Sequence, residues 1–511
     1  MSAYYFSEEH EMFRQGLKDF LKKEVEPHID EWEANERIPK SIWKKFGEMG
    51  YMGLNFPEEL GGSDVDFFYS VVFCEEVSKL FSGGFAAAAT VIQFMSAPYI
   101  FKHGSDFLKE KYLKPTIAGE MVSAIGITEP IAGSDVANIR TTAKKEGDFY
   151  IVNGQKTFIT NGVYGDYIVT VVKTDTEAGF NGFSLIVIDR EAEGVSAKKL
   201  KKLGWHASDT AELWFDNVKV PAENLIGEEG QGFVYLMGGL QLERLMGSVG
   251  AIAASEASIE YSMKYMNERE AFGRKINRFQ VLRHNLVQLV AEVESLKFYN
   301  YHCCRMFNDG KYAVKESSIS KLLCTELSNK VAYECLQFLG GYGYMEEYKM
   351  ARMYRDSRIL TIGGGSSEIM REILAKMIID EKQYKDSGLS IKYKKSKTEE
   401  TNLHNSNNQK QTSMAFDKIL EAISTRAKSA NALENTLKFD FGDKQIHIDG
   451  TEGENLVTTE NKEADCTIKI TQEDFEAILS GDLNPMGAFM SGKFKVDGDL
   501  GVAMKLQSLL G

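Results

Sequence analysis

The chain has 511 residues, 43% of them hydrophobic, and a chain of this size can bury more than one core, so we expect several domains. Its formal net charge of −14 comes from 60 basic and 74 acidic side chains, and no long basic block offsets it. Such a chain repels nucleic acid overall, so no nucleic-acid partner is expected.

The two ends of the chain favour a cytoplasmic protein. The first residues, 1–21, have no basic segment followed by an apolar one, and their acidic side chains argue against a transit peptide. No run of 18 consecutive apolar residues occurs, so no membrane span is expected, and the final SLLG is no peroxisomal signal.

The six cysteines form no C-x-x-C pair and stand at no zinc-finger spacing from histidines, which fits a reducing compartment. His302, Cys303 and Cys304 could be metal ligands. However, neighbouring side chains in a helix point about 100° apart, and no second cluster completes a site. We interpret the cysteines as buried structural thiols and predict no metal site.

The first part of the chain, residues 1–120, is predicted to be helical. Apolar residues recur at the spacing of an amphipathic helix at its start: Phe13, Leu17, Phe20, Leu21 and Val25. Helical character continues through the alanine-rich stretch 85–90 to about Gly119.

Residues 121–230 are predicted to form a β domain. β-Branched and aromatic runs fall at 149–152, 166–173, 183–188 and 212–220. Asn153-Gly154 and Asn161-Gly162 supply turn signals between such runs.

Residues 231–385 return to long helical patterns with hardly a proline, which predicts a helical bundle. Residues 386–413 are polar and poor in large apolar side chains, so they are expected to form a flexible linker. Residues 414–511 alternate again, at 437–441, 446–448 and 466–470, between helical stretches. The predicted fold class is therefore multidomain α+β: helical domain, β domain, helical bundle and a small α+β domain.

No G-x-G-x-x-G follows a predicted strand and no P-loop occurs, so neither nucleotide-binding motif can be claimed. The segment AIGITEPIAGSD, residues 124–135, instead combines small residues with hydroxyls. Backbone N–H groups can then approach a planar ring. This string resembles the flavin-binding signature of acyl-CoA dehydrogenases, although its G-S-D piece alone would indicate an ordinary turn.

That resemblance extends over residues 4–381 and implies the acyl-CoA dehydrogenase fold with FAD as cofactor. It places FAD contacts in residues 124–135 at Ile127, Thr128, Gly133 and Ser134, and it implies that Ser134 also reaches the substrate. GQKTFITNG resembles the strand that packs on the flavin ring, with Phe158, Ile159 and Thr160. Many relatives have Trp at the first of these positions, and Phe still offers a flat apolar face.

Two further strings resemble segments that contact the pyrophosphate and ADP parts of FAD. REAFGR with the glutamine after it implies contacts from Arg269, Phe272 and Gln280, and guanidinium geometry suits a pyrophosphate. QFLGGYGY implies contacts from Gln337, Phe338, Leu339, Gly340 and Gly341. In the family these residues reach across a subunit interface, which implies a homotetramer or at least a dimer. Alone, the two glycines would be read as a helix C-cap.

The catalytic base is the point where the sequence departs from the commoner family pattern. Many relatives carry it in a loop Y-E-G-T-S-E, and the matching stretch here is GGGSSE, with Gly364 at the glutamate position. A subset typified by isovaleryl- and long-chain acyl-CoA dehydrogenases uses a helix motif L-x-x-E-R-L instead. LQLERL matches that motif with Glu243. Taken alone, this string would indicate an exposed Glu-Arg pair.

The resemblance then assigns roles around this base. Glu243 is the catalytic base, and four residues contact the substrate besides Ser134: Gln241, Arg244, Gly364 and Gly365. Ser366, Ser367 and Glu368 contact the cofactor. Relatives often have Asp at the position of Gln241. The base should lie in a desolvated pocket, because burial raises the pKa of a carboxyl group.

The end of the chain, residues 464–510, is similar to the sterol-carrier-protein-2 domain (SCP2), which implies an apolar tunnel for a lipid or acyl-CoA ligand. Residues that could line it, or simply fill a small core, are Phe475, Met486, Phe489, Met490, Met504 and Leu506.

The implied activity is the α,β-dehydrogenation of acyl-CoA thioesters to trans-2-enoyl-CoA, of the fatty acid β-oxidation type, with electron-transfer flavoprotein as acceptor. Two alternatives stay open. One is an acyl-CoA oxidase that uses oxygen, and the other is a non-catalytic lipid-binding or scaffold protein.

Overall fold

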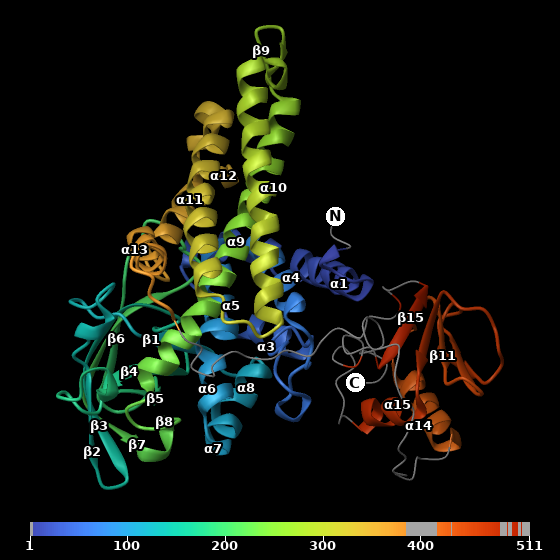
Figure 1. Cartoon of the computed structure of the whole chain (residues 1–511). Helices are drawn as coiled ribbons and strands as arrows, with labels where there is room; N and C mark the ends of the chain where they lie inside the picture. Colours follow the sequence, from blue (N-terminus) through green and yellow to red (C-terminus); the bar gives the residue numbers. More distant parts are fainter. Residues whose placement is uncertain are drawn as a thin grey trace. The chain divides into compact units, whose positions relative to one another are not determined.

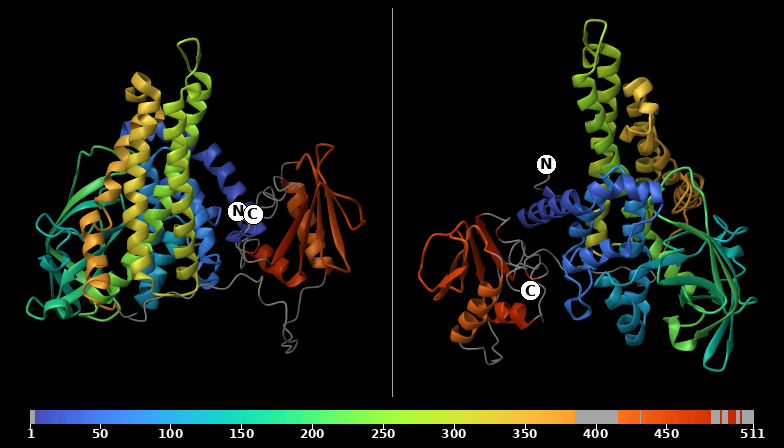
Figure 2. Two further views of the ribbon diagram at one scale, coloured as in Figure 1. Left: turned by 45° about the horizontal axis from the view of Figure 1, so that its top comes forward. Right: turned by 180° about the vertical axis from the view of Figure 1, so that it is seen from behind.

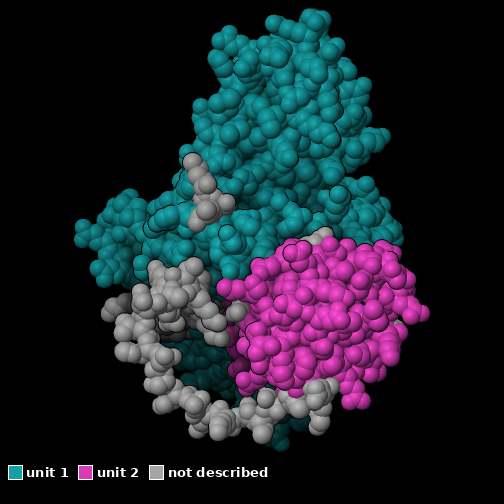
Figure 3. Space-filling model, turned by 90° about the vertical axis from the view of Figure 1, so that its right-hand side faces the viewer, with its two compact units in different colours: residues 1–52, 66–393 teal, residues 53–65, 394–511 magenta. Residues whose placement is uncertain are grey.

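The computed structural model describes residues 4–384, 416–430, 432–480, 488, 493–498 and 502. The chain divides into two compact units, coloured separately in Figure 3: residues 1–52 with 66–393, and residues 53–65 with 394–511. The predicted linker, residues 386–413, lies outside the described residues.

The first part of the larger unit is helical, as predicted. Its α-helices are α1 (Glu8–Glu24), α2 (Ile29–Asn35), α3 (Lys40–Glu48), α4 (Phe67–Ser78), α5 (Gly83–Thr90), α6 (Ala97–His103), α7 (Asp106–Leu108) and α8 (Lys114–Ile117). A capping box between Ser7 and His10 fixes the start of α1. The predicted apolar stripe is buried: Phe13, Leu17, Phe20, Leu21 and Val25.

Helix α4 is buried along its whole length, as a helix that is apolar on every side should be. Its two acidic residues are neutralised from α1. Arg14 donates to Glu75 at 2.6 Å and to Glu76 at 2.7 Å. A π-helical segment, Val91–Ser96, joins α5 to α6.

A β domain follows, also as predicted (Figure 1). Its strands are β1 (Ser123–Gly126), β2 (Thr142–Glu146), β3 (Phe149–Thr160), β4 (Tyr167–Lys173), β5 (Phe183–Asp189), β6 (Val195–Lys199), β7 (Thr210–Pro221) and β8 (Leu225–Ile226). Their order is β6-β7-β3-β2-β4-β5-β8, and β1 pairs with β4 in parallel.

The turn predicted at Asn153-Gly154 is wrong, whereas the one predicted at Asn161-Gly162 ends β3. Strand β3 runs through Gly154 with a register shift against β7, which is a β-bulge. Asn153 accepts a hydrogen bond from the backbone of Asn217 on β7 at 2.9 Å. A side chain at Gly154 would meet Thr141 at 2.6 Å. The glycine therefore serves close strand packing rather than a turn.

Long helices complete the larger unit. These are α9 (Gly232–Glu268), α10 (Gln280–Asn308), α11 (Val314–Leu339), α12 (Lys349–Ser357) and α13 (Ser367–Ile378). Helices α9, α10 and α11 pack against one another, as the views of Figures 1 and 2 agree. A short hairpin, β9 (Glu270–Ala271) and β10 (Arg274–Lys275), joins α9 to α10 at the far tip of the bundle. The predicted helical bundle is confirmed.

The three parts of this unit meet at one buried carboxylate, Asp356. It accepts hydrogen bonds from the backbone of Gly83 at 2.9 Å and of Trp205 at 2.6 Å. Gly83 belongs to the first helical part, Trp205 to the β domain and Asp356 to α12. A side chain at Gly83 would lie 2.4 Å from the indole nitrogen of Trp205, so the packing here requires glycine.

The smaller unit carries an α+β fold, as predicted. Its elements are α14 (Phe416–Ser429), β11 (Thr436–Asp440), β12 (Gln445–Asp449), β13 (Leu456–Thr458), β14 (Cys466–Ile470), α15 (Gln472–Ser480) and β15 (Phe494–Gly498). The sheet order is β13-β12-β11-β14-β15, with β11 and β14 parallel. Phe475 is buried in the core of this unit. The other predicted lining residues lie outside the described ones: Met486, Phe489, Met490, Met504 and Leu506.

All six cysteines are buried, which fits their predicted structural role. Across the described part of the chain, no group of three or more His, Cys, Asp or Glu side chains could hold a metal ion. One helical stretch there, Gly83–His103, is long and apolar enough to cross a membrane, and 78% of its most apolar window is buried inside the protein. Core helices share this property.

Candidate active site

Glu243 is a buried carboxylate in the first third of α9. Its side chain is not part of an exposed Glu-Arg pair, because the residue is only 6% exposed. The hydroxyl of Tyr99, on α6, donates to its Oε1 at 3.2 Å. Burial raises the pKa of Glu243 to about 7, against the lowering effects of the Tyr99 hydrogen bond and of Arg244. This carboxyl group can hold or release a proton near neutral pH.

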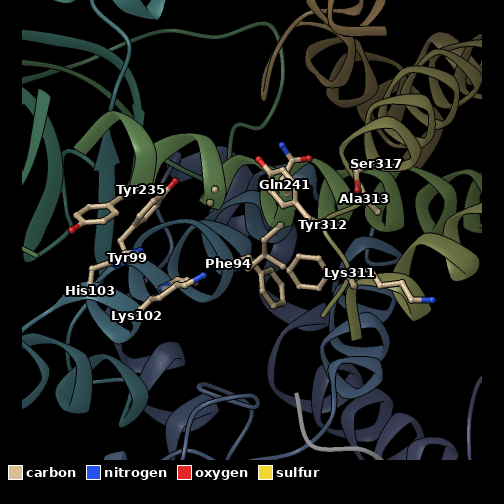
Figure 4. A pocket seen from close by; sticks show the side chains of 15 residues that line it. Phe94, Tyr99, Lys102, His103, Tyr235, Gln241, Lys311, Tyr312, Ala313 and Ser317 are labelled. Carbon is tan, nitrogen blue, oxygen red and sulfur yellow. The ribbon is translucent and has the colours of Figure 1, made fainter. Parts of the chain in front are cut away.

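A pocket next to Glu243 is lined mostly by apolar and aromatic side chains (Figure 4). Glu243 itself is not a lining residue, but its hydrogen-bond partner Tyr99 and its chain neighbour Leu242 are. Its empty volume is about 640 Å³, part of which opens to solvent. In the view of Figure 4, Tyr99, Tyr235 and His103 lie toward one end and Ser317 toward the other, with Gln241 between them. Gln241 is buried there, and its Oε1 has no hydrogen-bond partner among the described residues.

The glycine loop before α13 reaches the same place. Arg244 is buried, and its Nε donates to the carbonyl of Gly364 at 3.5 Å. Lys321, on α11, donates to the carbonyl of Gly365. A Cβ at Gly364 would meet nothing within 4 Å. The two places at which relatives carry the base are thus neighbours in this fold, and only Glu243 supplies a carboxylate.

Two other glutamates near the motifs are poor candidates for a base. Glu129 is buried, which alone would raise its pKa, but an ion pair with Lys156 at 2.8 Å and three hydrogen bonds lower it. Glu368 is exposed, and hydrogen bonds at the start of α13 lower its pKa. Both therefore stay ionised at neutral pH, unlike Glu243.

The predicted flavin strings of the β domain lie side by side. The backbone N–H of Thr157 donates to the carbonyl of Thr128 at 2.8 Å, which joins the loop to strand β3. Phe158 is 69% exposed with φ +62°, so its ring points out of the sheet, whereas Ile159 is buried in the core of the domain. Gly133 and Ser134 are exposed, and Ile127 and Thr160 are half-buried.

Two serines at the start of α13 differ in what their hydroxyls contact. Ser366 caps the helix by accepting from the backbone of Ile369 at 3.3 Å. Ser367 is buried, and its hydroxyl has no hydrogen-bond partner in the described structure. A buried hydroxyl without a protein partner is available to contact a bound cofactor.

The second group of predicted cofactor residues lies far from the first. Arg269 stands 26 positions after Glu243 at the end of the same helix, which is roughly 39 Å away at 1.5 Å per residue. Its guanidinium lies over the ring of Tyr342, 5.5 Å from the centroid. Phe272 is 94% exposed, and most other members of this group are also exposed: Gln280, Gln337, Gly340 and Gly341.

Phe338 and Leu339 differ from the rest of this group. Their side chains are buried in the core of the helical bundle, which leaves their backbone for any contact with a cofactor. One chain therefore does not bring all the predicted FAD residues together.

Tyr99 and Lys321 were not predicted from the sequence. Tyr99 stands 144 positions from Glu243, and Lys321 stands 44 positions from Gly365. No local pattern in one sequence connects residues so far apart. The helix that carries Tyr99 follows a π-helical segment, a feature common at functional sites, but its residues look like an ordinary apolar helix.

Comparisons with known proteins identify the families that this chain resembles. Three family models match the larger unit: the N-terminal domain of acyl-CoA dehydrogenases at residues 7–120, the middle domain at 124–218 and the C-terminal domain at 230–379. The SCP-2 sterol transfer family matches residues 416–511.

Relatives match over most of their own length. Long-chain specific acyl-CoA dehydrogenase of Sus scrofa is 38% identical, over 74% of this chain and 88% of that protein. Isovaleryl-CoA dehydrogenase of Oryza sativa is 35% identical, over 74% and 93%. A crystal structure of an acyl-CoA dehydrogenase from Geobacillus kaustophilus, 44% identical, has a TM-score of 0.72 and covers 73% of this chain and 99% of that one.

Other similar proteins have names that mention a cofactor, an electron-transfer complex or an oxidase. A glutaryl-CoA dehydrogenase from Mycobacterium smegmatis was solved with FADH₂ (25% identical), and a subunit of an Acetobacterium woodii caffeyl-CoA reductase-Etf complex is 35% identical. AnaB, a prolyl acyl carrier protein oxidase, is 27% identical. From its domain models and relatives, this chain belongs to the acyl-CoA dehydrogenase family and carries an SCP2 domain at its end.

Proposed function

We propose that this protein catalyses the flavin-dependent α,β-dehydrogenation of acyl-CoA thioesters to trans-2-enoyl-CoA, with Glu243 as the catalytic base. The observation that carries the proposal is the placement of Glu243, a buried carboxylate beside an apolar pocket, with a pKa of about 7. A general base with a pKa near the working pH transfers protons most effectively.

The residues present fit FAD. The exposed ring of Phe158 offers a flat apolar surface, Gly133 leaves open space for a close backbone approach, and the hydroxyl of Ser367 lacks a partner. When bound, FAD accepts the hydride from the β-carbon. We propose that Ile127, Thr128, Ser134, Ile159, Thr160, Ser366 and Glu368 complete its surroundings in the same chain.

The chain's own groups then position the acyl-CoA and receive the α-proton. The aromatic pocket takes the acyl chain and excludes water from Glu243. Gln241 offers an unpartnered amide oxygen at the pocket wall, and Arg244 fixes the carbonyl of Gly364 nearby. Ser134 and Gly365 are the remaining proposed substrate contacts.

The pKa of Glu243 sets an expected pH profile. Only the ionised carboxylate accepts a proton, so the second-order rate of flavin reduction should rise through about pH 7 and fall about tenfold per unit well below it. Stopped-flow reduction under anaerobic conditions between about pH 5.5 and 8.5 measures this midpoint. A flat profile over that range would contradict the assignment.

A second copy of the chain is needed to complete the proposed cofactor site. Arg269, Phe272 and Gln280 lie too far along the bundle to reach a flavin beside Glu243 of the same chain, and they are exposed. The proposal is that they contact the pyrophosphate and ADP parts of FAD held by a neighbouring subunit, together with residues 337–341. The proposal requires at least a homodimer, and the resemblance to the family implies a homotetramer.

The electron acceptor is proposed to be an electron-transfer flavoprotein. A similar protein that is a subunit of an Etf complex supports this choice. The similarity to the oxidase AnaB supports oxygen as the alternative electron acceptor. Reoxidation in air decides between the two. Stoichiometric hydrogen peroxide at each turnover would identify an oxidase.

The SCP2 domain is proposed to bind a lipid or acyl-CoA and to raise its local concentration near the active site, since a tether gives an effective concentration in the millimolar range. A chain that stops near Asp386 should keep its flavin and lose efficiency on the longest acyl-CoAs at low concentration. The measurement is kcat/KM against chain length for both forms. Equal values at every length would contradict the tether.

Long-chain acyl-CoAs are the proposed substrates, because the long-chain enzymes are among the most similar relatives, although isovaleryl-type relatives share the base. A cytoplasmic location stays a proposal, since both of these relatives are named as mitochondrial. A non-catalytic lipid-binding role remains the alternative from another class. It predicts that no acyl-CoA bleaches the flavin.

A further inference from the structure

Tyr99 is the residue through which the structure holds the proposed base. It is 3% exposed on α6, and its hydroxyl donates to Oε1 of Glu243 at 3.2 Å. The same hydroxyl lies 3.4 Å from the backbone carbonyl of Leu236, a second acceptor. Among the described residues, Tyr99 is the one hydrogen-bond donor to this carboxylate.

Helix α9 is shaped to admit the Tyr99 ring. Gly239 lies four residues before Glu243, on the same face of the helix one turn away. A Cβ at position 239 would lie 2.2 Å from the Tyr99 hydroxyl oxygen and 2.4 Å from its ring. Non-bonded heavy atoms do not approach one another so closely. The glycine at position 239 therefore permits the Tyr99 phenol to reach Glu243.

The hydrogen bond has a direct consequence for the carboxylate. It uses one acceptor site of Oε1, whereas Oε2 accepts no hydrogen bond from the described residues and is the freer oxygen to take a proton. It also favours the ionised form, since a donor stabilises a carboxylate more than a carboxylic acid. Arg244 adds attraction through its charge without bonding to Glu243. Tyr99 itself stays protonated, because burial and the neighbouring Glu243 raise its pKa well above the ordinary value.

We propose that Tyr99 is a positioning residue that holds Oε1 of Glu243, favours the ionised carboxylate and leaves Oε2 to face the α-carbon of the acyl-CoA. The proposal rests on the proposed role of Glu243 as base. Gly239 is part of the same arrangement, because the absence of a side chain there makes room for the Tyr99 phenol. When Oε2 is protonated, the Tyr99 hydroxyl can turn toward the carbonyl of Leu236 without losing a partner.

Tyr99→Phe tests the proposal, since it keeps the ring over Gly239 and removes only the hydroxyl. Loss of a hydrogen bond to a charged group should move the pH midpoint of anaerobic flavin reduction upward by about 1 to 2 pH units. The rate at pH 7 should fall about tenfold and recover in alkaline buffer. A second readout needs no turnover: the infrared C=O band of protonated Glu243, identified by its loss in Glu243→Gln, should persist to higher pH.

Two further variants make the test specific. Tyr150→Phe removes the hydroxyl of another buried tyrosine, which donates to the exposed carboxylate of Glu229 at 2.7 Å, and should leave both midpoints unchanged. Gly239→Ala displaces the Tyr99 phenol and should raise the midpoints as Tyr99→Phe does. Circular dichroism and flavin content report whether each variant folds.

The outcomes separate this inference from the proposed function. If Tyr99→Phe leaves both midpoints at the parental values while Glu243→Gln is inactive, the inference is overturned and the base assignment stands. If Glu243→Gln reduces its flavin at the parental rate, both fail. An upward shift in Tyr99→Phe and Gly239→Ala, without one in Tyr150→Phe, supports the inference.

Discussion

Replacing Glu243 with Gln should slow reduction of the flavin by acyl-CoA by about 10² to 10⁴-fold, the usual effect of losing a general base. The amide keeps the shape of the side chain and can still accept the Tyr99 hydrogen bond, so flavin content and acyl-CoA binding should persist. The measurement is anaerobic stopped-flow bleaching, with binding followed separately by calorimetry. Parental bleaching rates in this variant would show that the base lies elsewhere.

The matched rescue variant moves the carboxylate to the other family position. Glu243→Gly with Gly364→Glu should recover part of the activity, because Arg244 beside Glu243 also contacts the Gly364 carbonyl and a Cβ there meets nothing within 4 Å. Recovery is expected to be incomplete, since Gly364 has φ +64° and a side chain in that conformation costs about 1 to 3 kcal/mol. If the double variant binds flavin normally but recovers no activity, positions 243 and 364 are not equivalent places for the base.

Glu129→Gln should act on stability rather than on catalysis. It leaves the buried ammonium of Lys156 without its charge partner, and breaking a buried pair in this way costs about 3 to 5 kcal/mol. The lowered pKa of Glu129 has a related effect on the parent protein. The stability from this carboxylate is present above the ordinary glutamate pKa of about 4.3 and is lost as the pH falls through its lower, folded-state value.

Chemical denaturation, with turnover counted per bound flavin, separates the two roles of Glu129. The variant should unfold at much lower denaturant concentration, yet its turnover per flavin should fall far less than that of Glu243→Gln. Adding Lys156→Met removes the stranded charge and should recover much of the lost stability. A stable Glu129→Gln protein that no longer bleaches would make Glu129 the base.

The sequence predicts the order of helical and β parts because each part carries its own local pattern. The runs at 166–173 and 183–188 are rich in β-branched and aromatic residues, and they form strands buried at nearly every position. At Asn153-Gly154 the local signal is misleading. An Asn-Gly pair favours a turn, but pairing with β7, including the hydrogen bond from Asn217, and the close approach of Thr141 make it a bulge.

The candidate site also depends on contacts between residues far apart in the sequence, which local patterns do not reveal. LQLERL identifies Glu243 only through its resemblance to a family, since the string alone favours an exposed ion pair. Its hydrogen-bond partner Tyr99 lies on α6, far away in sequence, and Gly239 makes the room that lets Tyr99 approach. The sequence likewise does not predict the distance between Glu243 and Arg269. That distance follows from α9 being one continuous helix, Gly232–Glu268.

The central claim is that this chain oxidises an acyl-CoA at the flavin beside Glu243. Anaerobic titration of the purified yellow protein with saturated acyl-CoAs of graded length tests it most directly. The predicted result is bleaching of the flavin absorbance with formation of trans-2-enoyl-CoA, fastest for a long chain. A protein that holds stoichiometric FAD, yet is bleached by no acyl-CoA of any length, would contradict the claim and favour a lipid-binding role.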